Sequence, residues 1–498
     1  MKNLKIKILI ASFVALVLIT PAMAQMVTMD EAINVANNWI ALTIRQKGDW
    51  GGSNMAVVGE VQELKRGQRT IGYFCPVQPK GYIIISLRKE LAPVKACSET
   101  SDMNPECDDG VAKFIKDSME RIINRIEKEV GPIYSVRTRD LNKFLEIDYS
   151  ASWTKLNKDT DFFQKDLESE VGTLNYNEGE ILHTPNWHQG DPYNRDCPAP
   201  PDGDDCTEPR CVVGCVATAA AQIMRYWHWP PRGVGSGWDD SYDWVNMPDE
   251  VTGTSPSAQI NAVAELCHEI GVAVDMDYCA GDECASGAIT EDMEAVFEEY
   301  YRYSDSCCRL NRSDYTAEGW FNEIKIQLNG NQPTQYRVPG HSVVVDGWRV
   351  LGDARQYHIN CGWAGGRPDK PCWDGYTDTN TWYTLDAIPC SDPDEEFMLV
   401  NIHPGVSLTH SLSGTYFLWP PFPYRYFNRD ASGSSATFDA GQYLQFLPNI
   451  VVTSTGTIKF AGVTSFETRF FTRGDTSVGV RIDNGGISLY SGGKVKLY

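Results

Sequence analysis

The stretch VVGCVATAAAQIMRYW, Val212 to Trp227, places a glycine-flanked cysteine directly ahead of a run of alanines and larger apolar residues. The apolar residues after Cys215 recur at steps of three and four, which predicts a helix with one buried face, ended by the Trp-Pro-Pro sequence at 229–231. Cys215 then lies in the first turn, where unpaired N–H groups and the helix dipole favour an anion. Such a thiol has a lowered pKa, and its thiolate is nucleophilic. A disulfide-bonded or simply buried cysteine is the alternative that this stretch leaves open.

A nucleophilic cysteine needs a base, and a third group must orient that base. Of the eight histidines, His341 is the best candidate, because PGHSVVVDGW (339–348) places it at the mouth of a β-branched run. If residues 343–350 and 356–360 form two strands joined by the turn LGDA, the hairpin returns Asn360 close to His341. An asparagine there accepts the imidazole N–H and fixes the ring. A structural histidine at a strand end is the alternative.

Acyl transfer also requires donors for the charge that develops on the attacked carbonyl oxygen. Gln189, in NWHQGDPYNRDCP (186–198), offers a side-chain amide in a loop, and the backbone N–H of Cys215 is the predicted second donor. Taken alone, Gln189 also fits a solvated loop residue. We interpret two other histidines as structural: His358 lies inside a predicted strand, and His228 lies in an aromatic cluster at a helix end.

The first 24 residues have the features of a secretory signal: three lysines, an apolar stretch at 8–19, and Ala22-Met23-Ala24 as a small-x-small cleavage site. The apolar stretch is too short to span a bilayer comfortably, and no other run of the sequence is long enough. We therefore expect a protein that is exported to the extracellular or periplasmic space and has no membrane span.

Composition narrows the classes of partner. A net charge of −22 and a pI near 4.8 argue against nucleic-acid binding, which needs clustered Lys and Arg. The 15 cysteines fit an oxidising compartment, and their odd number leaves one unpaired if all the others pair. The sequence has neither an HExxH motif nor a spaced Cys/His quartet, so we expect no metal and no cofactor.

Periodicity predicts elements on both sides of this central region. Amphipathic helices are expected over 29–44 and 111–130, and a strand over 81–87. Between about 140 and 180 the chain is charged and has little apolar periodicity, as in KLNKDTDFFQKDLESE (155–170), which predicts an exposed connection that proteases can cut. The tail from about residue 434 alternates apolar and polar residues, which is typical of short antiparallel strands or of β-solenoid rungs.

Several motifs together resemble those of the streptopain family of secreted bacterial cysteine peptidases, which have a papain-like fold. The similarity in order and spacing covers GCVATAAAQIMRYWHWP (214–230), PGHSVVVDGW, HINCGWAGG (358–366) and NWHQGDPYNRDCP, and runs from about 172 to 404. GYIIISL with LAPVKACSETSD (91–102) is more weakly similar to the family's inhibitory prosegment. The resemblance implies that Cys215 is the nucleophile, His341 its partner, Gln189 part of the oxyanion hole, and Asn360 the neighbour that orients His341.

One departure from the family pattern concerns the aromatic shield of the site. Where the family usually has Asn-Trp-Gly-Trp, this chain has Asn360-Cys361-Gly362-Trp363, so the first indole is missing and Trp363 remains as the shielding aromatic. Cys361 is then able to pair with a neighbour such as Cys372, whose spacing suits a loop disulfide.

The predicted fold class is α+β. We expect a papain-like two-lobed cysteine peptidase, with the nucleophile on the central helix of a helical lobe and an antiparallel β lobe, between an α+β prodomain and a small all-β module. The predicted boundaries are a signal peptide (1–24), an inhibitory prodomain with a cleavable linker (25–172), the peptidase domain (173–405), a Pro/aromatic linker (406–433) and the β module (434–498).

The predicted function is a secreted cysteine endopeptidase made as a zymogen, which hydrolyses peptide bonds through a thioester on Cys215. Its expected partners are polypeptide substrates, its own prosegment as an intramolecular inhibitor, and a surface or glycan contact through the β module. Two alternatives stay open: a catalytically decayed surface or binding protein, and an acyl-transferring enzyme such as an amidase or transglutaminase. The presence of Gln189, Cys215, His341 and Asn360 together favours the peptidase, because a binding scaffold has no need of all four.

Overall fold

The computed structural model describes residues 25–405, except 109, 170–175, 203–205, 207, 231, 235–240, 281–283 and 364–379, and beyond 405 only the strands named below. The predicted signal peptide therefore lies outside the described residues. Among the described residues, no helix is long and apolar enough to cross a membrane. Nor does this part of the chain contain a group of three or more His, Cys, Asp or Glu side chains arranged to hold a metal ion.

The N-terminal region is an antiparallel sheet with helices packed on it. Helix α2 (Met29–Lys47) begins with a capping box, in which Thr28 and Glu31 exchange side-chain and backbone hydrogen bonds. The strands are β1 (Val57–Val58), β2 (Gln62–Arg66), β3 (Arg69–Gln78), β4 (Tyr82–Ser86) and β5 (Val94–Ser98), and the long helix is α3 (Gly110–Glu129). These elements confirm the two predicted helices and the predicted strand.

The charged stretch 155–170 is not the exposed connection that we predicted. After α4 (Thr138–Phe144), it forms the end of α5 (Ser150–Leu156) and all of α6 (Thr160–Ser169). Phe163 and Leu167 stand four residues apart on α6 and are both buried in a cluster with residues of α2 such as Trp39. Two apolar residues at this spacing are enough to dock a short helix, although they are too few to be seen as a periodic pattern.

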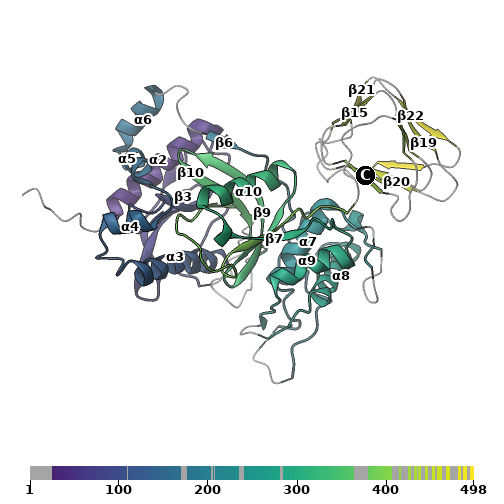
Figure 1. Cartoon of the computed structure of the whole chain (residues 1–498), viewed down its shortest axis with the longest axis horizontal. Coiled ribbons are helices and arrows are strands. Elements are labelled where there is room, and N and C mark those ends of the chain that lie inside the picture. Colours follow the sequence, from purple (N-terminus) through teal and green to yellow (C-terminus); the bar gives the residue numbers. More distant parts are fainter. Residues whose placement is uncertain are drawn as a thin grey trace, which may run out of the picture.

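The central region divides into a helical part and a sheet (Figure 1). The helical part contains α7 (Cys215–Trp227), α8 (Ser257–Ala273) and the short turns η1 (Trp244–Asn246), η3 (Thr290–Asp292), α9 (Met293–Ala295) and η4 (Val296–Tyr300). The remaining elements are β6 (Tyr176–Glu178), β7 (Cys308–Asn311), η5 (Arg312–Asp314), α10 (Ala317–Asn329), β8 (Thr334–Val338), β9 (His341–Leu351), β10 (Ala354–Asn360), β11 (Thr381–Thr384) and β12 (Phe397–Val400). The expected α+β class and the predicted β9–β10 hairpin are both confirmed.

One continuous antiparallel sheet joins the N-terminal and central regions. Its strand order is β1-β3-β4-β5-β11-β10-β9-β8-β12-β7, with β2 paired to β3 and β6 paired to β9. The junction is the pair β5–β11, in which Cys97 lies opposite Trp382 and Ala96 opposite Tyr383. Backbone hydrogen bonds, and not only side-chain packing, therefore hold the N-terminal region against the central one.

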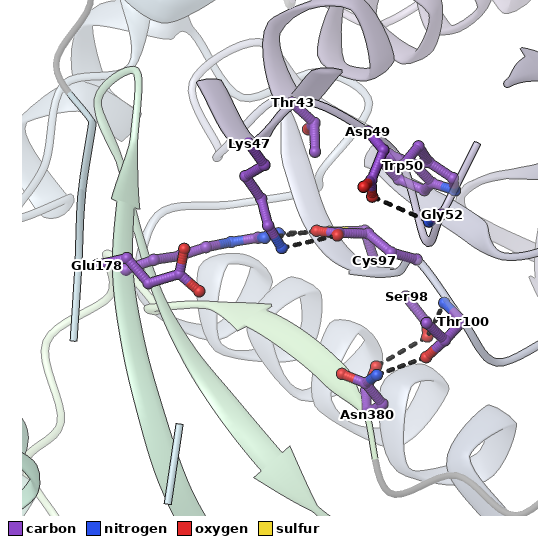
Figure 2. Close-up of polar contacts among 12 residues, drawn as sticks. Thr43, Lys47, Asp49, Trp50, Gly52, Cys97, Ser98, Thr100, Glu178 and Asn380 are labelled. Atoms are coloured by element: carbon purple, nitrogen blue, oxygen red, sulfur yellow. Dashed lines mark hydrogen bonds and ion pairs between the residues drawn. The ribbon is translucent and has the colours of Figure 1, made fainter. Parts of the chain in front are cut away.

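A buried ion pair lies beside this junction, near Lys47 and Cys97, which are labelled in Figure 2. The carboxylate of Glu99, next to β5, forms two ion pairs. Its Oε2 lies 2.8 Å from Nζ of Lys47, and its Oε1 lies 2.6 Å from Nη1 of Arg349 on β9. The Arg349 side chain is fully buried and lies over the ring of Trp382, 4.1 Å from its centroid. A buried guanidinium depends on its partner, so Glu99 ties the N-terminal region to β9.

Two disulfides close a loop of the central region. Cys206 pairs with Cys284 and Cys211 with Cys279, so the cysteines of CAGDECASGA (279–288) bind the segment just ahead of α7. Cys75 and Cys97 are buried thiols, whereas Cys107 is disulfide-bonded. The predicted Cys361–Cys372 pair involves a residue outside the described part of the chain.

The C-terminal strands pair in parallel, which supports β-solenoid rungs and not antiparallel hairpins. Gly414 pairs with Ala436, Ala436 with Ile458, and Ile458 with Ile487, each partner lying further along the chain. Strands β13 (Gly414–Tyr416), β14 (Tyr424–Phe427) and β15 (Ala431–Gly433) fall inside the predicted linker, so the strands begin earlier than predicted. The others are β16 (Ala436–Phe438), β17 (Tyr443–Phe446), β18 (Val451–Ser454), β19 (Thr457–Ala461), β20 (Glu467–Phe470), β21 (Arg481–Asp483), β22 (Gly486–Tyr490) and β23 (Lys494–Leu497).

Candidate active site

Cys215 is the first residue of α7, as the sequence predicted, and Gly214 occupies the N-cap position with φ 87°. A Cβ atom at position 214 would lie 2.6 Å from Sδ of Met276, so both the backbone angle and the available space require glycine there. The carbonyl of Gly214 accepts hydrogen bonds from the backbone N–H and the hydroxyl of Thr218. Every residue of α7 after Cys215 is buried, so the helix is a rigid support for the thiol.

The surroundings of the Cys215 thiol act in opposite directions. Burial raises the pKa of Cys215 above its ordinary value and outweighs the groups that favour the thiolate. Those groups are the backbone N–H of Ser342, the Arg337 guanidinium, and the backbone N–H groups of Cys215 and Val216. The helix start therefore does favour an anion, but the lowered pKa predicted from sequence is wrong for this covered state because desolvation penalises the charge more strongly.

His341 begins β9, and its ring is covered on several sides. Nε2 lies 3.1 Å from the carbonyl oxygen of Cys361, and Trp363 stacks on the ring with centroids 3.9 Å apart and planes 11° apart. Phe114, on α3, meets the same ring edge-on at 6.5 Å. Burial lowers the pKa of His341 to about 4, and the charges of Arg337 and Lys113 add to this. His341 is therefore a neutral imidazole in this state.

The tautomer of His341 follows from its hydrogen bond. A carbonyl oxygen only accepts, so Nε2 carries the proton and Nδ1 keeps a free lone pair. Within the described residues, no hydrogen bond joins His341 to Cys215, although the backbone N–H of the next residue, Ser342, interacts with the thiol. Cys215 thus lies beside the residue that follows His341. The base has a free lone pair, and the thiol has kept its proton.

Asn360 lies on β10 opposite Val344, three residues along β9 from His341. Its Oδ1 accepts from Nε2 of Gln222 on α7 at 3.0 Å and from the Gly362 N–H at 3.2 Å. Its Nδ2 donates to Oγ1 of Thr184 at 2.9 Å and to the carbonyl of Pro185 at 3.0 Å. We predicted that the Asn360 side chain accepts the hydrogen bond from the His341 ring, but the carbonyl oxygen of its neighbour Cys361 does so here. Asn360 instead connects α7 to β10 through its bond with Gln222.

Gln189 lies in a half-buried loop, and its backbone carbonyl accepts from the Val213 N–H at 2.9 Å. This bond holds the loop beside the two residues that lead into Cys215. Its side-chain amide makes no hydrogen bond within the described part of the chain. The amide is therefore uncommitted, which is what an oxyanion donor requires before substrate arrives.

Sequence reasoning missed three side chains that surround the pair. Phe114 and Lys113 come from α3, more than two hundred positions before His341, and no local pattern connects them. Arg337 could have been found from the sequence. The two-residue turn Pro339-Gly340 pairs Val338 with His341, so the preceding residue, Arg337, lies opposite Ser342. His228 ends α7 and stacks on Trp244, which agrees with the structural role we expected for it.

Comparison with known proteins adds independent information. Residues 187–369 match the Peptidase C10 family, and residues 24–122 match the Spi protease inhibitor family. Streptopain of Streptococcus pyogenes is 30% identical over 209 residues, which are 36% of this chain and 51% of streptopain. The thiol protease/hemagglutinin PrtT of Porphyromonas gingivalis is 29% identical over 223 residues, covering 40% of this chain and 24% of PrtT. The chain thus spans about half the length of the streptopains it matches.

Two solved structures are also similar. A Prevotella intermedia prointerpain A fragment shares 25% identity and covers 69% of this chain and 98% of its own, with a TM-score of 0.49. Active wild-type interpain A from the same organism is 28% identical. The match covers 45% of this chain and 95% of interpain A, with a TM-score of 0.34.

Proposed function

Because the chain carries a peptidase C10 domain preceded by a Spi-type inhibitor domain, we propose that it is a cysteine endopeptidase made as a zymogen. Cys215 is its nucleophile and His341 its base. The observation that supports this proposal best is the edge-on contact of Phe114 with His341, because Phe114 lies within the residues that match the inhibitor family. A binding protein would have no reason to bury that particular histidine under that domain.

The reaction is acyl transfer to water. Nδ1 of His341 takes the Cys215 proton, the thiolate attacks the peptide carbonyl, and the protonated imidazole then gives its proton to the leaving amine. The Gln189 amide and the Cys215 N–H stabilise the oxyanion. Water then hydrolyses the thioester. The Cys361 carbonyl supports this sequence, because it keeps the proton on Nε2 and strengthens the imidazolium that forms.

The inhibitor domain keeps the site inactive by dehydrating it. With α3 in place, the pKa of Cys215 is raised and that of His341 is lowered, so neither group takes the charged form that catalysis uses. Removal of α3 admits water and relaxes both shifts toward the ordinary values. Further contacts hold the helix in position, among them Arg125 with Glu395 at 3.3 Å.

The expected substrates are polypeptides, and the expected location is outside the cytoplasm after removal of residues 1–24. Export would keep the zymogen apart from cytoplasmic proteins until the inhibitor domain is released. A surface or glycan contact through the parallel strands beyond residue 413 remains a prediction, to be tested with the isolated full chain on glycan surfaces.

The test is self-processing and casein cleavage by the purified chain, with and without a mild reductant. We expect the wild type to shorten itself and cut casein, whereas Cys215→Ala remains full length and inactive. Cys308→Ser is the matched control, because Cys308 is another free, partly exposed thiol and lies on β7. If the wild type is inactive even after residues 25–172 are removed, the peptidase proposal is wrong.

A further inference from the structure

Asp346 and His358 form a buried pair that the reaction above does not use. Asp346 lies at a bulge, where the β9–β10 register shifts between His358 opposite Gly347 and Ile359 opposite Val345. Bulges re-aim a side chain and are frequent beside active sites. Gly347 leaves room for the imidazole, because a Cβ there would lie 2.9 Å from Cβ of His358. The backbone of both strands is therefore shaped around this pair.

His358 is held as an imidazolium. Its Nδ1 lies 2.5 Å from Oδ1 of Asp346, and its Nε2 lies 2.7 Å from Oδ1 of Asn380. Both partners are acceptors, so both ring nitrogens donate, and an imidazole that donates twice is charged. His358 is 4% exposed and Asp346 3%, so each ion depends on the other for its charge compensation.

The second oxygen of Asp346 connects the pair to the candidate active site. Oγ1 of Thr184 donates to Oδ2 of Asp346 at 2.5 Å, and the same Oγ1 accepts from Nδ2 of Asn360 at 2.9 Å. Asn360 in turn holds Gln222 of α7, the helix that begins with Cys215. Four side chains in hydrogen-bond contact thus run from His358 to Asn360, each with a defined donor and acceptor.

On the other side, the pair is connected to the inhibitor domain. Nδ2 of Asn380 donates to Oγ1 of Thr100, and the Ser98 hydroxyl donates to the Asn380 carbonyl at 2.8 Å. Figure 2 shows Asn380 facing these two residues. The acceptor of the His358 Nε2 proton is therefore itself oriented by the domain that covers the active site.

We propose that Asp346 and His358 are positioning residues: through Thr184 they fix the amide of Asn360, and with it the placement of α7 and its thiol against β9 and β10. This inference rests on the proposed peptidase function. Neither residue touches substrate. The pair instead fixes the direction of the Thr184 hydroxyl, which must donate to the carboxylate and so offers its lone pair to Asn360. The negative charge on Asp346 strengthens the hydrogen bond from the Thr184 hydroxyl, so loss of that charge weakens the preference for this orientation.

The sharpest test uses Thr184, because replacing it leaves the ion pair intact. Thr184→Val has nearly the same shape but no hydroxyl, and Thr184→Ser retains the hydroxyl. We expect Thr184→Val and Asp346→Asn to lower kcat about tenfold to a hundredfold per titratable thiol with KM little changed, as for a misplaced catalytic group. Thr184→Ser should retain most of the activity. His403→Gln, at a partly buried histidine outside this chain of contacts, should match the wild type.

A second readout does not require proteolysis. The rate of Cys215 alkylation by iodoacetamide should differ from the wild-type rate in Thr184→Val and Asp346→Asn. It should equal the wild-type rate in Thr184→Ser and His403→Gln. Nitrogen-15 NMR of the full chain should show two N–H protons on His358. Unchanged kcat and unchanged alkylation in a folded Thr184→Val protein would overturn the positioning role, even if the wild type is a peptidase. An inactive wild type would instead remove the peptidase proposal, and the alkylation rates would still decide whether the pair positions the thiol.

Discussion

Phe114 of the inhibitor domain meets the ring of His341 edge-on, with ring centroids 6.5 Å apart and planes at 66°. The second aromatic partner of the imidazole is Trp363, stacked with ring centroids 3.9 Å apart. The candidate base thus contacts one ring from the residues that match the Spi protease inhibitor family and one from the residues that match the Peptidase C10 family.

Replacing Phe114 by alanine should therefore speed activation. The substitution removes an aromatic contact, worth about 0.5–1.5 kcal/mol beyond buried area, and opens a path for water to the imidazole. We expect faster self-processing of the full chain and faster alkylation of Cys215. Phe162→Ala is the control, because Phe162 is 66% exposed on α6. Equal rates for Phe114→Ala and the wild type would show that this ring does not restrain the site.

The folded chain, with His341 covered, should become less stable in acid. Its pKa is about 4 when covered, against 6.5 ordinarily, so the unfolded chain binds a proton between these values that the folded chain does not. Stability then rises with pH across this window, by about 1.4 kcal/mol per pH unit at most. Urea unfolding of Cys215→Ala and of Cys215→Ala/His341→Gln from pH 4 to 7.5 isolates this contribution. Parallel pH profiles for the two proteins would contradict it.

Breaking the Glu99–Arg349 pair should loosen the inhibitor domain. Although burial acts to raise the pKa of Glu99, Arg349 and Lys47 hold it below its ordinary value, so its stabilisation is present at neutral pH and is lost as the pH falls through the folded pKa. Glu99→Gln removes the ion-pair partner of the buried Arg349 guanidinium and leaves Glu178 as a remaining acidic neighbour, so we expect a loss of up to about 3–5 kcal/mol. Urea unfolding in the Cys215→Ala background measures this loss. Glu63→Gln, at an exposed pair with Lys65, should change stability by less than about 1 kcal/mol.

Gly214→Ala should damage the start of α7. The residue has φ 87°, which costs a side chain about 1–3 kcal/mol, and its new Cβ would press on Met276. We expect a lower melting temperature and a slower reaction of Cys215 with iodoacetamide. Gly287→Ala is the control, since a Cβ there meets nothing within 4 Å and the backbone angle is ordinary. A Gly214→Ala protein as stable and as reactive as this control would disprove the requirement.

Local patterns in the sequence were sufficient for several elements. The steps of three and four after Cys215 predicted α7, the stripe in 111–130 predicted α3, and the β-branched run after His341 predicted the β9–β10 hairpin. Each of these depends on residues that are close in sequence, where helical and strand periodicities hold without knowledge of the rest of the chain. Residues 155–170 were not predicted as helical because their buried apolar residues, Leu156, Phe163 and Leu167, are too few to form a periodic pattern.

The sequence by itself determined which chemical groups are present and on which elements they lie: a thiol at a helix start, an imidazole at a strand start, and an amide in the neighbouring loop. Only the tertiary structure decided that the Cys361 carbonyl and not the Asn360 side chain accepts from His341, that Phe114 covers the ring, and that β5 pairs with β11. These contacts join residues far apart in the chain, and burial there reverses the pKa shift that the helix start alone predicts for Cys215. Desolvation is a property of everything that surrounds a group, so no local pattern can report it.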